Sequence, residues 1–433
     1  MTQTSRFSHI QVVTFLYTFY GAHMSESSAY LSDFRPRFRQ PSAADLCTPA
    51  PCMTTESTNE KVLETFTQHR ELVSLPVVEG QQPIGLINRD IFLSQISKPF
   101  RLELYGRKSC LAFMDKEPLI VDASMDIETL TFKAVEFGEK ALSDGFIITR
   151  NNEFAGVGSG LQLMRAVAEI QAARNRQIMH SIEYASVIQQ SALRSSREIL
   201  SLACPEADLV WEPRDVVGGD FYQFSVDDGG WFATVADCTG HGVPGAFMTL
   251  IASSSLSQAI KEKGARDPAA LLAIVNRSIK QMLGQVGGQD GTPGSDDGMD
   301  AACFWYEPGT RQMVFAGARL SLFVLRPGVD QVDVVEGQRK GVGYVDSELD
   351  YAWRNVAVDL PAGSLVFATT DGLVDQVGGP RAIAFGKRRL CELLRGLASS
   401  TPAQLNRDVL AALQQWQGEH HRRDDVTFFC FRT

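Results

Sequence analysis

The C-terminal half of the chain carries several aspartates, each at one end of an apolar, strand-like run, and this pattern limits what the chain can fold into. Carboxylates on adjacent buried strands repel each other and lose solvation, so such an arrangement is unfavourable by itself. A divalent cation between them would offset both costs, and hard oxygen ligands suit magnesium or manganese. For a single Asp-Gly pair, a turn or capping aspartate is the alternative interpretation. The aspartates concerned are Asp220, Asp237, Asp371, Asp424 and Asp425.

Four motifs contain these aspartates. They are E-P-R-D-V-V-G-G-D-F-Y at 212–222, A-D-C-T-G-H-G-V-P-G-A at 236–246, T-T-D-G-L-V-D-Q at 369–376 and D-D-V-T at 424–427. With these motifs, residues 203–433 resemble the metal-dependent PPM, or type 2C, serine/threonine phosphatases, in the bacterial branch of sporulation and stress-response regulators. The hairpin turns and flanking helices of this region suit two packed sheets, and the resemblance implies an α-β-β-α sandwich.

The resemblance also implies a ligand set for two manganese or magnesium ions. Asp237 is expected to bridge both ions, whereas Asp371 and Asp424 hold one of them. Asp220 is either a direct ligand or orients metal-bound water. The implied metal ligands are the carboxylates of Asp220, Asp237, Asp371, Asp424 and Asp425 and the backbone carbonyl of Cys238.

Hydrolysis of a phosphomonoester by a metal-activated water needs no covalent nucleophile. No Cys-x5-Arg loop surrounds Cys238, which argues against a thiol phosphatase. An arginine near the position of Arg214 contacts phosphate in related enzymes, as the bidentate geometry of a guanidinium allows; a salt bridge with Asp215 is the alternative. His241 is a candidate general acid, with a strand-to-helix turn residue as the alternative.

An internal repeat spans residues 41–165. Leu63 aligns with Leu130 and Gly85 with Gly156, and each copy predicts a helix, a strand, a polar turn, a strand and a helix. The repeat resembles a tandem pair of cystathionine-β-synthase-type (CBS) modules, an α/β fold that commonly senses adenine nucleotides in the cleft between the copies. The acid that binds ribose in that family comes one residue early, as Asp90, in the first copy and is absent from the second. A structural or dimerising module is therefore the alternative.

Residues 161–203 lack proline and predict one long connecting helix that ends before Pro205. Its apolar positions follow a heptad-like pattern that Gln189 and Ser196 interrupt. Two interpretations compete: a parallel coil in a homodimer that carries a signal to the phosphatase, or an amphipathic helix packed on its own chain.

These features predict an α+β protein of four parts. Residues 1–40 are uninformative, and a start at Met24 is favoured over a signal peptide. The sensor pair occupies 41–160, the helical linker 161–203 and the phosphatase 204–433. The net charge of −10 argues against nucleic-acid binding, and no run is long enough to span a membrane. The eight scattered cysteines suit reduced thiols in the cytoplasm.

The predicted substrate is a phosphoserine or phosphothreonine on a regulatory protein, a STAS-domain antagonist of an anti-sigma factor. Two alternatives remain open: a catalytically silent scaffold that binds a signalling partner, and a hydrolase of small phosphoesters. A Gly/Asp-rich insertion at 284–298 is interpreted as a solvated loop, with a further metal ligand as the alternative.

Overall fold

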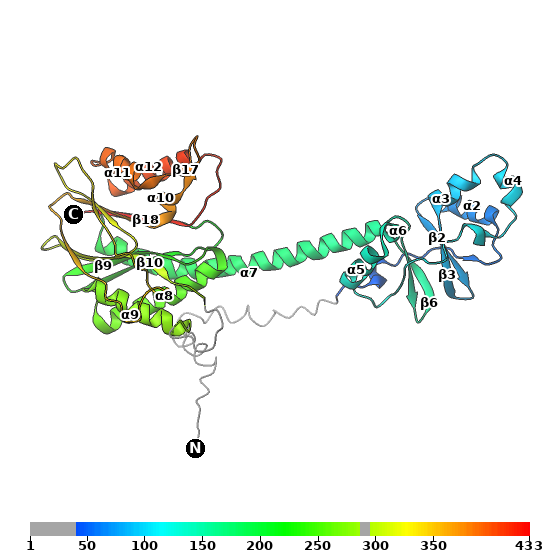
Figure 1. Ribbon diagram of the computed structural model, residues 1–433, viewed down its shortest axis with the longest axis horizontal. Helices are drawn as coiled ribbons and strands as arrows, with labels where there is room; N and C mark the ends of the chain where they lie inside the picture. Colours follow the sequence, from blue (N-terminus) through cyan, green and yellow to red (C-terminus); the bar gives the residue numbers. More distant parts are fainter. Residues whose placement is uncertain (1–39, 286–294) are drawn as a thin grey trace, which may run out of the picture. The chain divides into compact units, whose positions relative to one another are not determined.

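The computed structural model describes residues 40–285 and 295–433, and the chain divides into two units at Asn175 and Arg176 (Figure 1). The predicted start at Met24 and most of the 284–298 insertion lie outside the described residues. Within the described part of the chain, no helix is both long and apolar enough to cross a membrane.

The first unit contains two copies of one β-α-β-β-α arrangement. The first copy comprises β1 (Met53–Thr54), α2 (Asn59–Gln68), β2 (Ser74–Glu79), β3 (Gln82–Asn88) and α3 (Arg89–Ile96). The second comprises β4 (Ile120–Asp122), α5 (Ile127–Phe137), β5 (Phe146–Arg150), β6 (Glu153–Gly158) and the start of α7 (Gly160–Ala203). In both copies the first strand pairs in parallel with the second, which pairs antiparallel with the third. Each copy therefore has the predicted order of elements plus a short leading strand.

Two five-stranded sheets form the centre of the second unit. One has the order β14 (Val356–Asp359), β11 (Gln312–Ala318), β10 (Met299–Glu307), β9 (Gly230–Cys238), β8 (Asp220–Asp227). The other has the order β13 (Asp333–Val335), β12 (Leu322–Leu325), β15 (Leu365–Thr369), β18 (Val426–Arg432), β7 (Ala207–Glu212). Helices α8 (Gly242–Lys263) and α9 (Pro268–Met282) cover the first sheet, and α11 (Gly386–Gly396) and α12 (Pro402–Gln417) cover the second (Figure 1). The predicted α-β-β-α sandwich is confirmed.

Aromatic side chains from both sheets fill the space between them. The Trp231 ring of β9 meets Phe431 of β18 edge-on at 4.9 Å, and Phe304 of β10 stacks on Phe431 at 5.9 Å. Each such pair contributes about 0.5–1.5 kcal/mol beyond the area it buries. This contact holds β9 and β18 face to face, so that the aspartates at the ends of these strands belong to one rigid frame.

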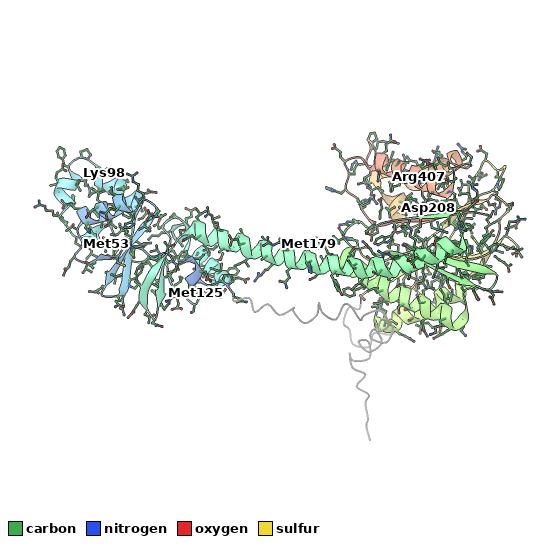
Figure 2. All side chains as sticks on the ribbon, turned by 180° about the vertical axis from the view of Figure 1, so that it is seen from behind. Met53, Lys98, Met125, Met179, Asp208 and Arg407 are labelled. Atoms are coloured by element: carbon green, nitrogen blue, oxygen red, sulfur yellow. The ribbon has the colours of Figure 1, made fainter. Side chains whose placement is uncertain are left out.

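The closing helices cover the outer face of the second sheet. Helix α12 lies on β7, where Asn406 donates a hydrogen bond of 2.9 Å to Asp208 Oδ2; Figure 2 labels Asp208 and Arg407, the residue after Asn406. The sequence pattern of residues 381–397 predicts one helix, but in the structure this helix, α11, begins only at Gly386. Ala382 has a left-handed backbone (φ 48°), and the chain forms the short strand β17 (Ile383–Ala384) before α11 begins.

The C-terminal part of α7 packs on the second unit. Its buried positions recur every three or four residues, at Ser186, Gln189, Leu193, Ser196 and Leu200. The two residues that interrupt the apolar heptads make hydrogen bonds there, because Ser196 Oγ accepts from the Phe224 N–H (2.7 Å) and Gln189 bonds to Gly218. For this part of the helix, the structure supports an amphipathic helix packed on its own chain.

Candidate metal centre and active site

Three aspartates form a row across the first sheet. Asp220 of β8 is the direct register partner of Asp237 on β9, and Asp237 is the partner of Asp300 on β10. Residues in register on neighbouring strands, about 4.8 Å apart, project from the same face of a sheet. The sequence predicted that Asp220 and Asp237 lie on adjacent strands, but it assigned no role to Asp300.

The second sheet brings Asp371 and Asp424 to this row. Asp371 opens the short helix α10 (Asp371–Asp375) directly after β15, and Asp424 precedes β18. A Cβ at Gly372 would lie 1.9 Å from the Asp425 carbonyl oxygen, so only glycine lets these two segments approach so closely. This approach explains why the predicted Asp-Gly pair and the terminal Asp-Asp pair share one site.

Thr370 joins the two sheets at the row. Its Oγ1 donates to Asp220 Oδ2 at 2.8 Å and accepts from the Thr427 N–H at 3.0 Å. The Asp220 carboxyl is 1% exposed, and within the described part of the chain its Oδ1 has no hydrogen-bond partner. A buried carboxylate oxygen without a partner is costly, and binding to a cation as a ligand would offset that cost.

Burial and mutual repulsion raise the pKa of three of these carboxyls. Burial is the largest cause of the raised pKa of Asp220, Asp237 and Asp371. The charges of neighbouring aspartates raise the pKa of each of them further. The Asp371 carboxyl raises the pKa of Asp237, because a proton on Asp237 relieves the repulsion between the two groups. A divalent cation would replace such a proton and pair with both charges, so this donor set fits magnesium or manganese. Among residues 40–285 and 295–433, no three acidic, histidine or cysteine side chains already converge as a formed metal site.

The backbone around Cys238 suits the role expected for its carbonyl. The Cys238 N–H donates to the Gly219 carbonyl at 3.0 Å, as in a regular antiparallel pair. In a regular pair the Gly219 N–H would in turn donate to the Cys238 carbonyl. Here the Gly219 N–H donates to Asp425 Oδ2 instead, at 2.6 Å. The Cys238 carbonyl therefore does not receive the ladder hydrogen bond that would compete with a cation.

Asp425 is mainly a loop anchor. It is 2% exposed, and its Oδ1 accepts from the Arg214 N–H at 2.6 Å while Oδ2 accepts from Gly219. Burial raises its pKa, and the two backbone hydrogen bonds lower it. One carboxylate thus holds both ends of the segment that leads into Asp220. This use of both oxygens distinguishes Asp425 from Asp424, which is half-buried and accepts only from the Asp425 N–H, at 2.9 Å.

Arg214 and His241 both lie beside Asp215. Arg214 is exposed; its Nη1 donates to the Arg423 carbonyl at 3.1 Å, and its Nε is 3.9 Å from Asp215 Oδ2. His241 Nδ1 is 2.9 Å from the same oxygen, and His241 is the residue that precedes α8. The salt bridge considered from the sequence is thus present but long, and it leaves most of the Arg214 guanidinium free for an anion.

Gln189 is a site residue that the sequence did not reveal. Its Nε2 donates to the Gly218 carbonyl at 2.7 Å, and its Oε1 accepts from the Gly218 N–H at 3.1 Å. The same Nε2 also donates to Thr249 Oγ1 of α8 at 3.2 Å. The signal available in the sequence was a glutamine at a seam position of the helix, which was interpreted only as an interruption of a coil.

Comparisons with known proteins identify relatives of this chain. A family model described as Stage II sporulation protein E (SpoIIE) matches residues 227–433. The PP2C domain of SiaA from Pseudomonas aeruginosa is 37% identical, with 60% of this chain and 99% of that chain covered and a TM-score of 0.53. The PP2C domain of SpoIIE from Bacillus subtilis, with a fragment of its regulatory domain, is 17% identical (52% and 61% covered, TM-score 0.42). The RsbU and RsbW domains of a Mycobacterium tuberculosis protein are 20% identical (52% and 59% covered, TM-score 0.41). No curated protein matches the chain.

Proposed function

Because this chain belongs to the SpoIIE-type PP2C family of serine/threonine phosphatases, a family that depends on metal ions, we propose that its carboxylate row holds two manganese or magnesium ions and hydrolyses a phosphomonoester on a regulatory protein. The observation that carries the proposal is the cross-strand pair of buried Asp220 and half-buried Asp237, in which Asp220 Oδ1 has no hydrogen-bond partner among the described residues. When bound, the ions would activate a water molecule and offset charge on the phosphoryl oxygens.

The residues of the chain have separate tasks in this proposal. Asp237, the Cys238 carbonyl, Asp220, Asp371 and Asp424 would hold the ions, with Asp237 as the ligand that both would share. We keep Asp425 as a possible additional ligand, since each of its oxygens retains a second lone pair beside its backbone hydrogen bond.

Two further side chains act on the substrate. Arg214 binds phosphoryl oxygens with the guanidinium N–H groups that Asp215 and Arg423 leave free. His241, whose Nδ1 lies 2.9 Å from Asp215 Oδ2, is the general acid that we propose for the leaving serine or threonine oxygen.

The substrate we propose is a phosphoserine or phosphothreonine on a small STAS-domain protein, an antagonist of an anti-sigma factor. Its support is the match of residues 227–433 to the sporulation-type family model. We place the reaction in the cytoplasm, where the eight free thiols would stay reduced.

We further propose that the N-terminal unit regulates the phosphatase through α7, within a homodimer. The support is the direct bond of Gln189 on α7 to Gly218, two residues before Asp220. A shift of α7 that broke these bonds would release the segment that carries Asp220.

The ligand proposed for the N-terminal unit is an adenine nucleotide in the cleft of a CBS-like pair. A cavity of about 230 Å³ lies between the copies, lined by Leu72, Ser74, Leu86, Phe146, Ser159 and Gln162 among others. Asp90 is exposed and does not line this cavity. Gln162 Nε2 donates a hydrogen bond to Thr48 Oγ1 at 2.9 Å. Binding of nucleotide would therefore require Gln162 to exchange this partner for the ribose.

The test is hydrolysis of p-nitrophenyl phosphate by the full chain with manganese, compared with Asp237→Ala and with a chelator. We expect turnover that both changes abolish. A fragment of residues 176–433 is the right companion, because α7 is part of the core of this unit. Activity in the fragment alone would indicate inhibition by the N-terminal unit, whereas silence of both, with no manganese bound, would refute the proposal.

A further inference from the structure

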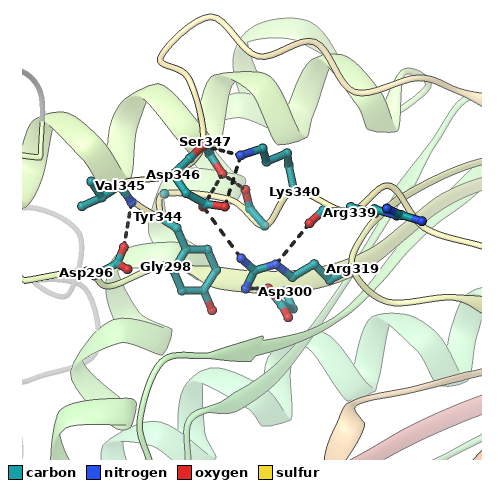
Figure 3. A network of polar contacts seen from close by, with 12 residues as sticks. Asp296, Gly298, Asp300, Arg319, Arg339, Lys340, Tyr344, Val345, Asp346 and Ser347 are labelled. Atoms are coloured by element: carbon teal, nitrogen blue, oxygen red, sulfur yellow. Dashed lines mark hydrogen bonds and ion pairs between the residues drawn. The ribbon is translucent and has the colours of Figure 1, made fainter.

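Arg319 lies at the Asp300 end of the carboxylate row. It directly follows β11, whose last residue, Ala318, is the register partner of Ala301, the neighbour of Asp300. Its Nη1 donates to Asp300 Oδ1 at 3.4 Å, and its Nη2 is 3.8 Å from Asp346 Oδ1. Figure 3 shows the guanidinium group between these two carboxylates and beside Tyr344. Arg319 is therefore an arginine in direct contact with the Asp300 end of the row.

The position of Arg319 is strongly determined by its surroundings. Its backbone is left-handed (φ 61°), which costs free energy for a residue with a Cβ. Its N–H donates to the Gln338 carbonyl at 2.7 Å, and its guanidinium carbon lies 4.4 Å from the centre of the Tyr344 ring. The segment that carries Tyr344 is itself fixed, because Lys280 Nζ donates to the Tyr344 carbonyl at 2.6 Å. The guanidinium is thus preorganised rather than free to sample solvent.

The guanidinium nevertheless keeps capacity for another partner. A guanidinium has five N–H donors, and those of Arg319 are used only in contacts of 3.4 Å or longer, including one from Nε to the Arg339 carbonyl. Its side chain is 36% exposed, although Asp300 beside it is only 18% exposed. A cation that is rigid, partly open to solvent and loosely paired is suited to bind an anion bidentately.

We propose that Arg319 is a second phosphate-binding arginine of the phosphatase, which holds the phosphoryl group of the substrate together with Arg214. This inference rests on the proposed function, because it places the phosphoryl group over the aspartate row. Asp300 and Tyr344 are then positioning residues that aim the Arg319 guanidinium.

The experiment compares Arg319→Ala and Arg319→Lys with Arg311→Ala in the full chain. Arg311 is a close control, since it is also exposed and also has a left-handed backbone (φ 55°). It directly precedes β11, whereas Arg319 directly follows β11. Binding of inorganic phosphate to the manganese-loaded protein is measured by calorimetry, and p-nitrophenyl phosphate kinetics are measured in parallel.

We expect Arg319→Ala to weaken phosphate binding and to raise KM by about tenfold or more, as for loss of a charged hydrogen bond, with kcat changed much less. The phosphate affinity and KM of Arg319→Lys should lie between those of Arg319→Ala and wild type, because lysine keeps the charge but cannot bind phosphate bidentately. Arg311→Ala should match wild type. Unchanged phosphate affinity in Arg319→Ala, or a loss of kcat with unchanged KM, would overturn the inference. Because phosphate binding needs no turnover, the two failures can be told apart: a wild-type protein that binds phosphate without hydrolysing the ester, and loses that binding in Arg319→Ala, would refute the proposed function but not the phosphate contact of Arg319.

Discussion

Replacing Gln189 by methionine tests whether α7 holds the segment before Asp220. Methionine has a similar length and volume but cannot donate or strongly accept hydrogen bonds, so the change isolates the polar contacts. It would leave the N–H and the carbonyl of Gly218, which is buried, without their side-chain partners. Each buried backbone group left unpaired costs about 1–3 kcal/mol, so for these two groups we expect a loss of about 2–6 kcal/mol.

The assay is urea or thermal unfolding of the manganese-loaded protein, followed for the phosphatase unit. For a unit of this size, a loss of 1 kcal/mol lowers Tm by about 2–4 °C, so the expected shift is about 4–24 °C. The weakened segment should also lower the affinity for manganese, because Gly218 lies two residues before Asp220.

Gln190→Met is the matched control. Gln190 is the next residue of the same helix, it is exposed, and its side chain donates only to Ser186 Oγ, at 3.2 Å. We expect a change within about 0.5 kcal/mol for this exposed position. If Gln189→Met and Gln190→Met unfold alike and bind manganese alike, the proposed link between α7 and the metal centre is refuted.

Two further predictions concern the packing and the charge of the site. Gly372→Ala should abolish manganese binding or folding, because its Cβ would lie 1.9 Å from the Asp425 carbonyl oxygen. The control is Gly396→Ala, a helical position with nothing near its Cβ, which should be neutral or slightly stabilising. Circular dichroism and manganese titration of both variants are the measurements, and normal manganese binding by Gly372→Ala would contradict the close approach of these two segments. The raised pKa values of Asp220 and Asp237 mean that the folded protein binds more protons than the unfolded chain, so stability without metal should fall as pH rises from about 4 through the folded-state pKa values. Manganese must displace those protons, so the rise in Tm that it causes should be larger at pH 8 than at pH 6, and equal rises would count against these carboxyls as ligands.

Much of the fold was predictable because its signals are local. The strand at Ala207–Glu212 and the helices that begin near Pro244 and Pro268 follow from hydrophobic periodicity and from proline in the first turn. The repeat in the N-terminal half gave its element order for the same reason. The start of α11 was missed because the left-handed residue Ala382 depends on contacts from α12, whose Trp416 donates from Nε1 to the Ile383 carbonyl.

The sequence by itself determined the fold class of the phosphatase unit and the aspartates that meet in it, since Asp220, Asp237, Asp371 and Asp424 each stand at a strand end that local patterning defines. Only the tertiary structure decided what surrounds them. Cross-strand register puts Asp300 beside Asp237, and the approach of two chain segments gives Asp425 the backbone N–H groups of Arg214 and Gly219. The docking of α7 likewise turns Gln189 from an interruption of a heptad into a support of the site. These roles depend on pairings between residues far apart in the chain, and hydrophobic periodicity carries no information about which distant residues face each other.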